Sequence, residues 1–225
     1  MTSQLMPGDQ STILITAGPT REAIDPVRYL TNRSSGKMGY ALASTAAEQG
    51  HRVILISGPT QLDVPDRVDY IPVETAEEMY QAVEHHIGKA NIAIFAAAVA
   101  DYRPAVVPEQ KIKKSAESMT IELVRNPDVL GSVRNTFGYK GILVGFAAET
   151  ENVETNAREK LTSKGCDLVV ANDVSRKDIG FDVNENEILL VFPNTTETPP
   201  KDSKQHLAHV ILDHALELAA VGNTD

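Results

Sequence analysis

Short apolar segments alternate along the chain with amphipathic ones, and this alternation restricts the fold more than any single motif does. Ser11–Gly18, Arg52–Gly58 and Asn91–Val99 are rich in aliphatic residues and carry few charges, which is typical of strands buried on both faces. Gly36–Gly50 and Thr75–Gly88 lie between them and have the residue spacing of helices. Because strands and helices alternate, the sequence predicts a parallel sheet covered by helices.

The second half of the chain continues this pattern. Gly141–Glu149 and Asp167–Asp173 are predicted strands, and Asn152–Gly165 between them is a predicted helix, so they form a second βαβ unit. Met119–Arg125 and Asn186–Pro193 alternate apolar and polar residues more regularly, which favours strands nearer an edge of the sheet. We therefore predict an α/β fold with a Rossmann-like, doubly wound, mostly parallel sheet and helices on both faces, ending in a helix over Ser203–Ala220.

Composition and charge limit the class of protein. A chain of 225 residues with 42% hydrophobic residues can bury one sizeable core, so we expect one domain over residues 12–225 and a disordered lead-in or linker remnant over residues 1–11. No apolar run approaches the roughly 20 residues of a membrane-spanning helix. A net charge of −10 argues against a nucleic-acid partner. The single cysteine, Cys166, and a start without signal-peptide features favour the cytoplasm.

The connection between the first predicted strand and helix, Gly18–Gly39, is unusually long. Such links usually take about 2 to 6 residues, and longer ones are commonly functional. We therefore expect chemistry here and, secondarily, in the irregular stretches 101–118 and 173–186. The connection contains these charged and amide residues: Arg21, Glu22, Asp25, Arg28, Asn32, Arg33 and Lys37.

The end of this connection has the features of a phosphate site. Ser34, Ser35, Gly36 and Lys37 lie where a helix begins, so free backbone N–H groups, two hydroxyls and an ammonium could converge on a phosphate. A second interpretation is equally open, in which one serine caps the helix and Lys37 is solvated. The glycine patterns of dinucleotide-binding folds and P-loops do not occur here.

Two further clusters follow predicted strands. Asp101 ends a run of small residues, where its carboxylate could hold a divalent cation or a sugar hydroxyl, or only form a turn or cap a helix. Lys111, Lys113 and Lys114 form a basic loop that is either solvated or closes over a polyphosphate.

The third cluster combines a helix start with a strand end. Asn126-Pro127-Asp128 indicates the start of a helix, and Phe146 at a strand end could pack on a ring. Lys160 and Lys164 are four residues apart and therefore share a helix face. Each feature also has a purely structural interpretation, as cap, core aromatic and solvated face.

Taken together, the motifs resemble those of a known family over nearly the whole chain from about Thr12 onward. They follow the order and approximate spacing of phosphopantothenoylcysteine synthetase, an enzyme of the coenzyme A pathway: GPTREAIDPVRYLTNRSSGKMG, AAVADYRP, KIKK, NPD, GFAAET and ANDVS. The chain is most similar to the bacterial, CTP-using form, which is often fused behind a flavin-dependent decarboxylase. Whether it stands alone or is excised from such a fusion stays open.

The resemblance implies a ligase reaction in two steps. The carboxylate of 4'-phosphopantothenate attacks the α-phosphate of CTP, giving an acyl-cytidylate and pyrophosphate, and the amine of L-cysteine then attacks the acyl carbon and releases CMP. Mg²⁺ is expected with the polyphosphate. The resemblance also implies a homodimer whose substrate pocket is completed by the neighbouring subunit, and a fused or associated flavin-dependent decarboxylase.

The same resemblance assigns the site residues. Asn32 would hold the acyl group, Arg28 would help to position it, and Lys111 would reach the nucleotide from the mobile loop as a third catalytic residue. Ser34 to Lys37 would hold a phosphate of either CTP or phosphopantothenate, and Asn172 belongs to the substrate pocket. Asp101 would contact CTP or its metal. The full set of CTP-binding residues is Phe95, Ala96, Ala97, Asp101, Lys111, Pro127, Asp128, Val129, Leu130, Phe146, Lys160 and Lys164.

Two other classes of function are considered beside the ligase. A nicotinamide-dependent reductase would fit the fold, but the glycine fingerprint is missing and no tyrosine is followed four residues later by lysine. A nucleotide-sensing binding module would keep the pocket without consuming CTP.

Overall fold

An eight-stranded sheet forms the centre of the molecule. The computed structural model describes residues 10–114, 117–175 and 185–222. The sheet order is β13-β12-β10-β9-β6-β1-β4-β5, in which β12 and β13 are antiparallel and the other six strands are parallel. Its strands are β1 (Thr12–Ala17), β4 (Arg52–Ser57), β5 (Val68–Pro72), β6 (Ile92–Phe95), β9 (Ile142–Glu149), β10 (Leu168–Asp173), β12 (Leu189–Val191) and β13 (Thr196–Glu197).

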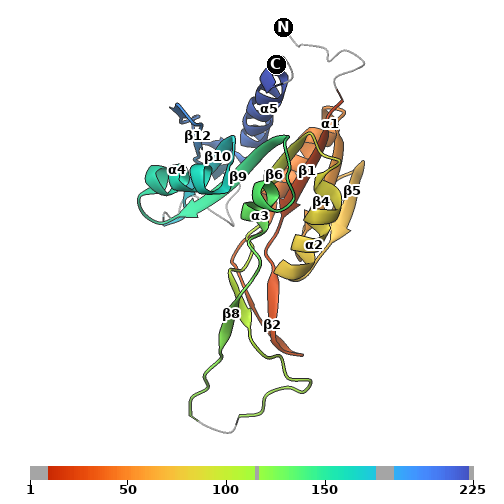
Figure 1. Ribbon diagram of the computed structural model, residues 1–225, viewed down its shortest axis with the longest axis vertical. Helices are drawn as coiled ribbons and strands as arrows, with labels where there is room; N and C mark the ends of the chain where they lie inside the picture. The colour runs from red at the N-terminus through yellow and green to blue at the C-terminus, as the bar shows by residue number, and fades with distance from the viewer. Residues whose placement is uncertain (1–9, 115–116, 176–184, 223–225) are drawn as a thin grey trace.

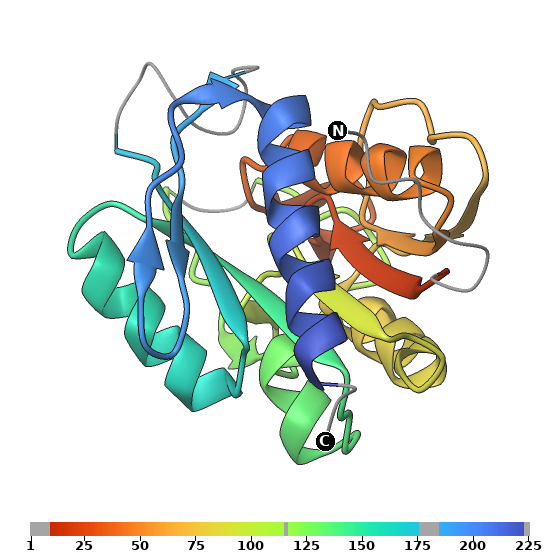
Figure 2. The same cartoon turned by 90° about the horizontal axis from the view of Figure 1, so that it is seen from above.

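Helices cover both faces of this sheet. α1 (Lys37–Glu48) and α5 (Lys204–Gly222) pack on one face, and Figure 2 shows α5 crossing it between α1 and the β12–β13 hairpin. α2 (Ala76–Ile87), α3 (Val129–Asn135) and α4 (Val153–Lys164) pack on the other face. The expected Rossmann-like, mostly parallel α/β architecture is therefore confirmed.

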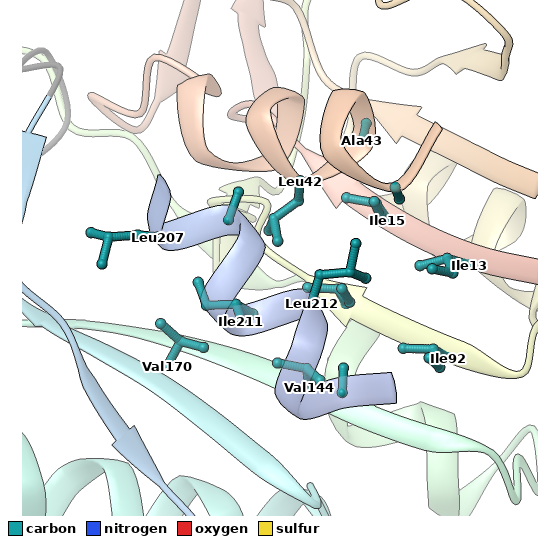
Figure 3. Close-up of a cluster of buried hydrophobic side chains, with 14 of the residues drawn as sticks. Ile13, Ile15, Leu42, Ala43, Ile92, Val144, Val170, Leu207, Ile211 and Leu212 are labelled. Carbon is teal, nitrogen blue, oxygen red and sulfur yellow. The ribbon is translucent and has the colours of Figure 1, made fainter. Parts of the chain in front are cut away.

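Alternate side chains of β1 point into the two hydrophobic cores, one on each face of the sheet. Ile13 and Ile15 point to the α1/α5 side, where they join Leu42, Leu207 and other aliphatic side chains (Figure 3), and Leu14 between them points to the opposite side. All three β1 side chains are fully buried, and each such burial stabilises the fold by about 1.5–3 kcal/mol. A strand buried on both faces needs a continuous apolar sequence, which is what β1 has.

The strand order reverses beside β1. The chain passes from β1 outward to β4 and β5, and then returns to the other side of β1 with β6. The carboxyl ends of β1 and β6 are tied by backbone hydrogen bonds from Ala98 N to Gly18 O (2.9 Å) and from Thr20 N to Ala98 O (3.2 Å). In open α/β sheets, ligands bind in the crevice outside such a switch point.

Two hairpins extend beyond this edge as an arm (Figure 1). β2 (Arg21–Asp25) pairs with β3 (Arg28–Thr31), and β7 (Tyr102–Pro104) pairs with β8 (Leu123–Arg125). The long connection that the sequence indicated therefore contains a hairpin of its own.

Two expectations from the sequence were wrong in this region. Met119–Arg125 is not an edge strand of the sheet, because only Leu123–Arg125 is extended and it pairs with β7 in the arm. The stretch 101–118, expected to be irregular, contains β7. Alternation alone does not say which strand is the partner, and the exposed Leu123 and Val124 show that this alternation does not reflect packing on the core.

The remaining predictions about the chain stand as follows. Asn186–Pro193 provides the edge strand β12, as expected, while the expected irregular stretch 173–186 lies partly outside the described residues and includes β11 (Glu185–Asn186), which pairs with β14 (Asp202–Ser203). The predicted lead-in lies almost wholly outside the described residues. None of the helices in the described ranges has the length and apolarity needed to cross a membrane.

Candidate active site

Two adjoining cavities lie at the carboxyl ends of the parallel strands. We call them the Ser34 cavity, of about 270 Å³, and the Asp128 cavity, of about 560 Å³. They are continuous, because five residues line both of them: Ala97, Val99, Asp101, Phe146 and Lys160. The exposed Asp101 side chain therefore lies at the junction of one larger cleft.

The Ser34 cavity begins at the N-terminus of α1. Ser34, Ser35 and Gly36 line it, and Gly36 occupies the cap position of α1 in the left-handed region at φ 78°, which favours glycine. No side chain caps the helix; instead, Gly36 N donates to Ser34 Oγ (3.3 Å). The capping interpretation of the serines is therefore not what the structure has. Lys37 does not line this cavity but a neighbouring one, beside Tyr40 and Asp63.

Residues from the C-terminal part close the other side of the Ser34 cavity. Asn172, at the end of β10, was predicted, but Asn186 on β11 and Lys204 at the start of α5 were missed. Asn186 is 5% exposed and Lys204 is 7% exposed. A buried lysine is uncommon, and the sequence signal that could have found Lys204 is its position directly before an apolar helix.

The Asp128 cavity contains most of the predicted CTP residues. Asp128 caps α3 by accepting from Gly131 N (2.9 Å), and its other carboxylate oxygen pairs with Lys164 Nζ. Burial raises the pKa of Asp128, but the hydrogen bond from Lys164 and that from Gly131 outweigh it and the pKa is lowered overall. The predicted residues that line this cavity are Phe95, Ala97, Asp101, Pro127, Asp128, Val129, Leu130, Phe146, Lys160 and Lys164.

Two other predicted residues, Ala96 and Asn32, lie at the Ser34 cavity. Ala96 lines it directly. Asn32 follows β3 and its Nδ2 donates to the backbone oxygen of Ala98 (2.9 Å), a residue that lines the Ser34 cavity. The β2–β3 hairpin thus brings the Asn32 amide to the rim of the cleft.

Arg28 and Lys111 are not brought to the cleft. Both line a separate cavity of about 780 Å³ in the arm, with Lys113 and Lys114. Arg28 forms an ion pair with Asp25, and its Nη2 also donates to Ile112 O (3.2 Å). The arm therefore gathers four cations away from the residues that line the two cavities.

The cleft offers donors and cations around its walls. Lys160 Nζ donates to Phe146 O (2.9 Å), so its ammonium is held at the junction beside Asp101. Over the described ranges, no group of three or more His, Cys, Asp or Glu side chains could hold a metal by itself. The single carboxylate of Asp101 nevertheless fits Mg²⁺, which is usually held by one or two carboxylates together with substrate phosphates.

Cys166 does not supply a nucleophile to this cleft. Its thiol is buried outside both cavities, and this burial raises its pKa to about 12. The thiol therefore stays protonated near neutral pH.

The chain is similar to bifunctional proteins of coenzyme A biosynthesis. The bifunctional coenzyme A biosynthesis protein CoaBC of Vibrio vulnificus (strain YJ016) is 51% identical over 211 residues, which are 93% of this chain and 53% of that protein. The CoaBC protein of Escherichia coli (strain K12) is 47% identical over 204 residues, 89% of this chain and 50% of that protein. The chain thus spans about half the length of these relatives.

A solved structure and a family model cover most of the chain. The crystal structure of a CoaBC C-terminal domain superposes with a TM-score of 0.79 at 40% identity, over 96% of this chain and 97% of that one. Residues 9–218 match the model of the DNA/pantothenate metabolism flavoprotein C-terminal domain. The chain therefore belongs to the DNA/pantothenate metabolism flavoprotein C-terminal domain family.

Proposed function

We propose that residues 12–225 form a phosphopantothenate–cysteine ligase domain of coenzyme A biosynthesis. The domain activates the carboxylate of 4'-phosphopantothenate with CTP and then joins it to L-cysteine. The observation that carries this proposal is that the predicted CTP residues other than Lys111 line one cleft at the switch point of the sheet. The 40% identity to a CoaBC C-terminal domain over nearly its full length supports the same reaction.

In the first step, CTP would occupy both cavities. We assign the phosphates to the Ser34 side, because it lies at the N-terminus of α1 and Lys204 lines this cavity but not the Asp128 cavity. The cytidine is then assigned to the Asp128 cavity, where Lys164 already pairs with the Asp128 carboxylate. Mg²⁺, when bound at Asp101, would neutralise phosphate charge that develops as pyrophosphate leaves.

In the second step, fixed donors would stabilise the acyl group while the cysteine amine attacks. The Asn32 amide is oriented by its bond to Ala98 O, so its position is set before substrate binds. Such preorganised donors typically contribute about 10²–10³ in rate. This preorganisation supports the role in acyl transfer that the family resemblance implies for Asn32.

We further propose that the arm docks on a second copy of the chain. Apolar side chains are exposed along it, including Val27 (59%), Tyr29 (46%) and Val106 (78%). A second subunit would cover them and would receive Arg28 and Lys111 at its cleft. A flavin-dependent decarboxylase, fused or associated, is proposed as the additional partner, because the relatives are bifunctional and about twice as long.

Pyrophosphate release tests the proposal. With CTP, phosphopantothenate and Mg²⁺, we expect release without cysteine and amide product only with it, and ATP in place of CTP tests the choice of nucleotide. A nucleotide-sensing module would bind CTP without consuming it, so binding without release from any nucleotide refutes the ligase.

Asn32→Ala separates the two steps. It should preserve pyrophosphate formation and lower amide formation by about 10²-fold or more. Asn135→Ala is the control, because this amide bonds Gly131 O at the far end of α3. Equal loss of both steps in Asn32→Ala would contradict the role assigned to it.

A further inference from the structure

Asp25 lies at the turn of the β2–β3 hairpin, yet its side chain is fully buried. Its relative side-chain exposure is 0%, while the next four residues, from Pro26 in the turn to Tyr29 in β3, are all exposed. A carboxylate is rarely buried without partners, because removal from water is costly unless several donors replace the solvent. The hydrogen-bond donors around Asp25 therefore show which segments of the chain its carboxylate connects.

Those donors come from two segments that are distant in sequence. Asp25 Oδ1 accepts from Val27 N and Arg28 N, each at 2.9 Å, and Asp25 Oδ2 accepts from Arg28 Nε (3.0 Å) and Nη2. Oδ2 also accepts from Ile112 N (3.1 Å), which lies in the loop between β7 and β8. The hydrogen bonds from Arg28 hold the pKa of Asp25 well below its usual range, so the carboxylate is charged at neutral pH.

Ile112 is held at both polar groups of its backbone. Its N–H donates to Asp25, and its oxygen accepts from Arg28 Nη2 (3.2 Å). Asp25 and Arg28 thus form hydrogen bonds with both backbone polar groups of Ile112. Because Ile112 lies between Lys111 and Lys113, these hydrogen bonds fix the position of the segment that carries the lysines.

The Asp25 carboxylate also offsets electrostatic repulsion between the basic residues of the arm. Arg28, Lys111, Lys113 and Lys114 line one cavity with the single carboxylate of Glu117, so four positive charges that repel each other face one negative charge. The carboxylate of Asp25 contacts Arg28 directly and bonds the backbone beside Lys111, so it supplies the opposite charge at the point where the two segments meet.

We infer that Asp25 is a positioning residue that holds Arg28 and the Lys111–Lys114 segment together as one unit. This inference rests on the proposed function, in which the cleft of a second subunit receives Arg28, which positions the acyl group, and Lys111, which contacts CTP. One carboxylate thereby sets the geometry for both steps of the reaction. Loss of Asp25 should consequently impair CTP use through Lys111 and amide formation through Arg28.

Asp25→Asn in the full chain tests this inference, because it keeps the size and removes the charge. Backbone hydrogen exchange in peptides covering residues 109–114 should become about tenfold faster or more. The KM for CTP should rise and amide formation should fall, each by about tenfold. Asp69→Asn is the control, since Asp69 is 58% exposed and pairs with Arg52 elsewhere on the surface; it should change none of these values.

Two more variants separate positioning from general stability. In an Arg28→Gln background, Asp25→Asn should no longer lower amide formation but should still raise the KM for CTP, because an amide accepts from Ile112 N more weakly than the carboxylate does in either background. Ile112→Pro removes the same bond from its other partner and should raise the KM for CTP alike, which keeps the test available if Asp25→Asn folds poorly.

The outcomes are distinguishable from those of the proposed function. Unchanged exchange over residues 109–114 in Asp25→Asn, or a proportional loss of both steps in every background together with a lowered melting temperature, overturns the inference. If the unmodified chain releases no pyrophosphate from any nucleotide, the ligase proposal fails, while the exchange measurement still decides whether Asp25 holds the two segments.

Discussion

Gly39 should be replaceable by alanine only at the expense of both stability and nucleotide binding. It lies in the first turn of α1, where the helix passes directly over the end of β1. A Cβ built on Gly39 would be 2.5 Å from Ala17 Cβ and 3.1 Å from Ala17 Cα. Carbon atoms do not approach so closely, so α1 would have to move away from the sheet by about 1 Å to reach ordinary contact.

The magnitude follows from overpacking a buried contact. Such insertions typically cost about 1–3 kcal/mol, and this outweighs the roughly 0.5–1 kcal/mol that alanine gains over glycine in a helix. The net cost is about 0.5–2 kcal/mol, so for a domain of this size the melting temperature should fall by roughly 1–8 °C. Gly39 also lines the Ser34 cavity, so a displaced α1 should raise the KM for CTP.

Denaturant unfolding and initial-rate assays measure the two effects. Gly88→Ala is the matched control, because a Cβ there meets no atom within 4 Å, and its free energy of unfolding should stay within about 0.5 kcal/mol of the parent. If Gly39→Ala is as stable as Gly88→Ala and binds CTP normally, the close approach of α1 to β1 does not set the position of the cavity.

Three further predictions concern other parts of the molecule. Arg134→Met removes a guanidinium that donates to three backbone oxygens and a carboxylate, so it should lower the free energy of unfolding by about 2–4 kcal/mol in a urea titration. In the same titration, Arg52→Met, which breaks an exposed ion pair, should lower it by less than about 1 kcal/mol. Cys166 should resist iodoacetamide at pH 8 in the native protein and react rapidly in urea, because its buried thiol has a pKa of about 12; rapid native labelling would contradict this. Lys204→Met should raise the KM for CTP at least several-fold, whereas Lys89→Met should leave it unchanged, because Lys89 lines a separate cavity that shares no residue with the cleft.

The parts of the fold that the sequence predicted are those where local periodicity and burial coincide. β1, β4 and β6 are continuous apolar runs because both of their faces are covered, so their sequence alone identifies them. Residues such as Phe95, Asp101 and Phe146 could then be assigned to one cleft, because parallel strands bring their carboxyl ends to the same edge of the sheet.

The arm escaped prediction because its structure depends on pairing between distant segments. β2 has the polar sequence REAID, and the two residues it buries are charged, so it lacks the apolar alternation of a core strand. β7 and β8 are three residues long each and are separated by the loop 105–122, so no local sequence pattern predicts that they pair. Lys204 and Asn186 were missed for the same reason, since the β11–β14 pair brings them together.

The residues of the proposed site are held in place in two different ways, by the core or by the polar contacts of the arm. Apart from Lys111, the groups that would bind CTP lie at or near the ends of strands and helices, whose backbone is fixed by the core. Arg28 and Lys111 stand on the arm, where no core restrains them, and their positions depend on one buried carboxylate. A polar network outside the core has to be fully satisfied to hold a single geometry. The five donors to Asp25 therefore give the arm the rigidity that packing gives the rest of the cleft.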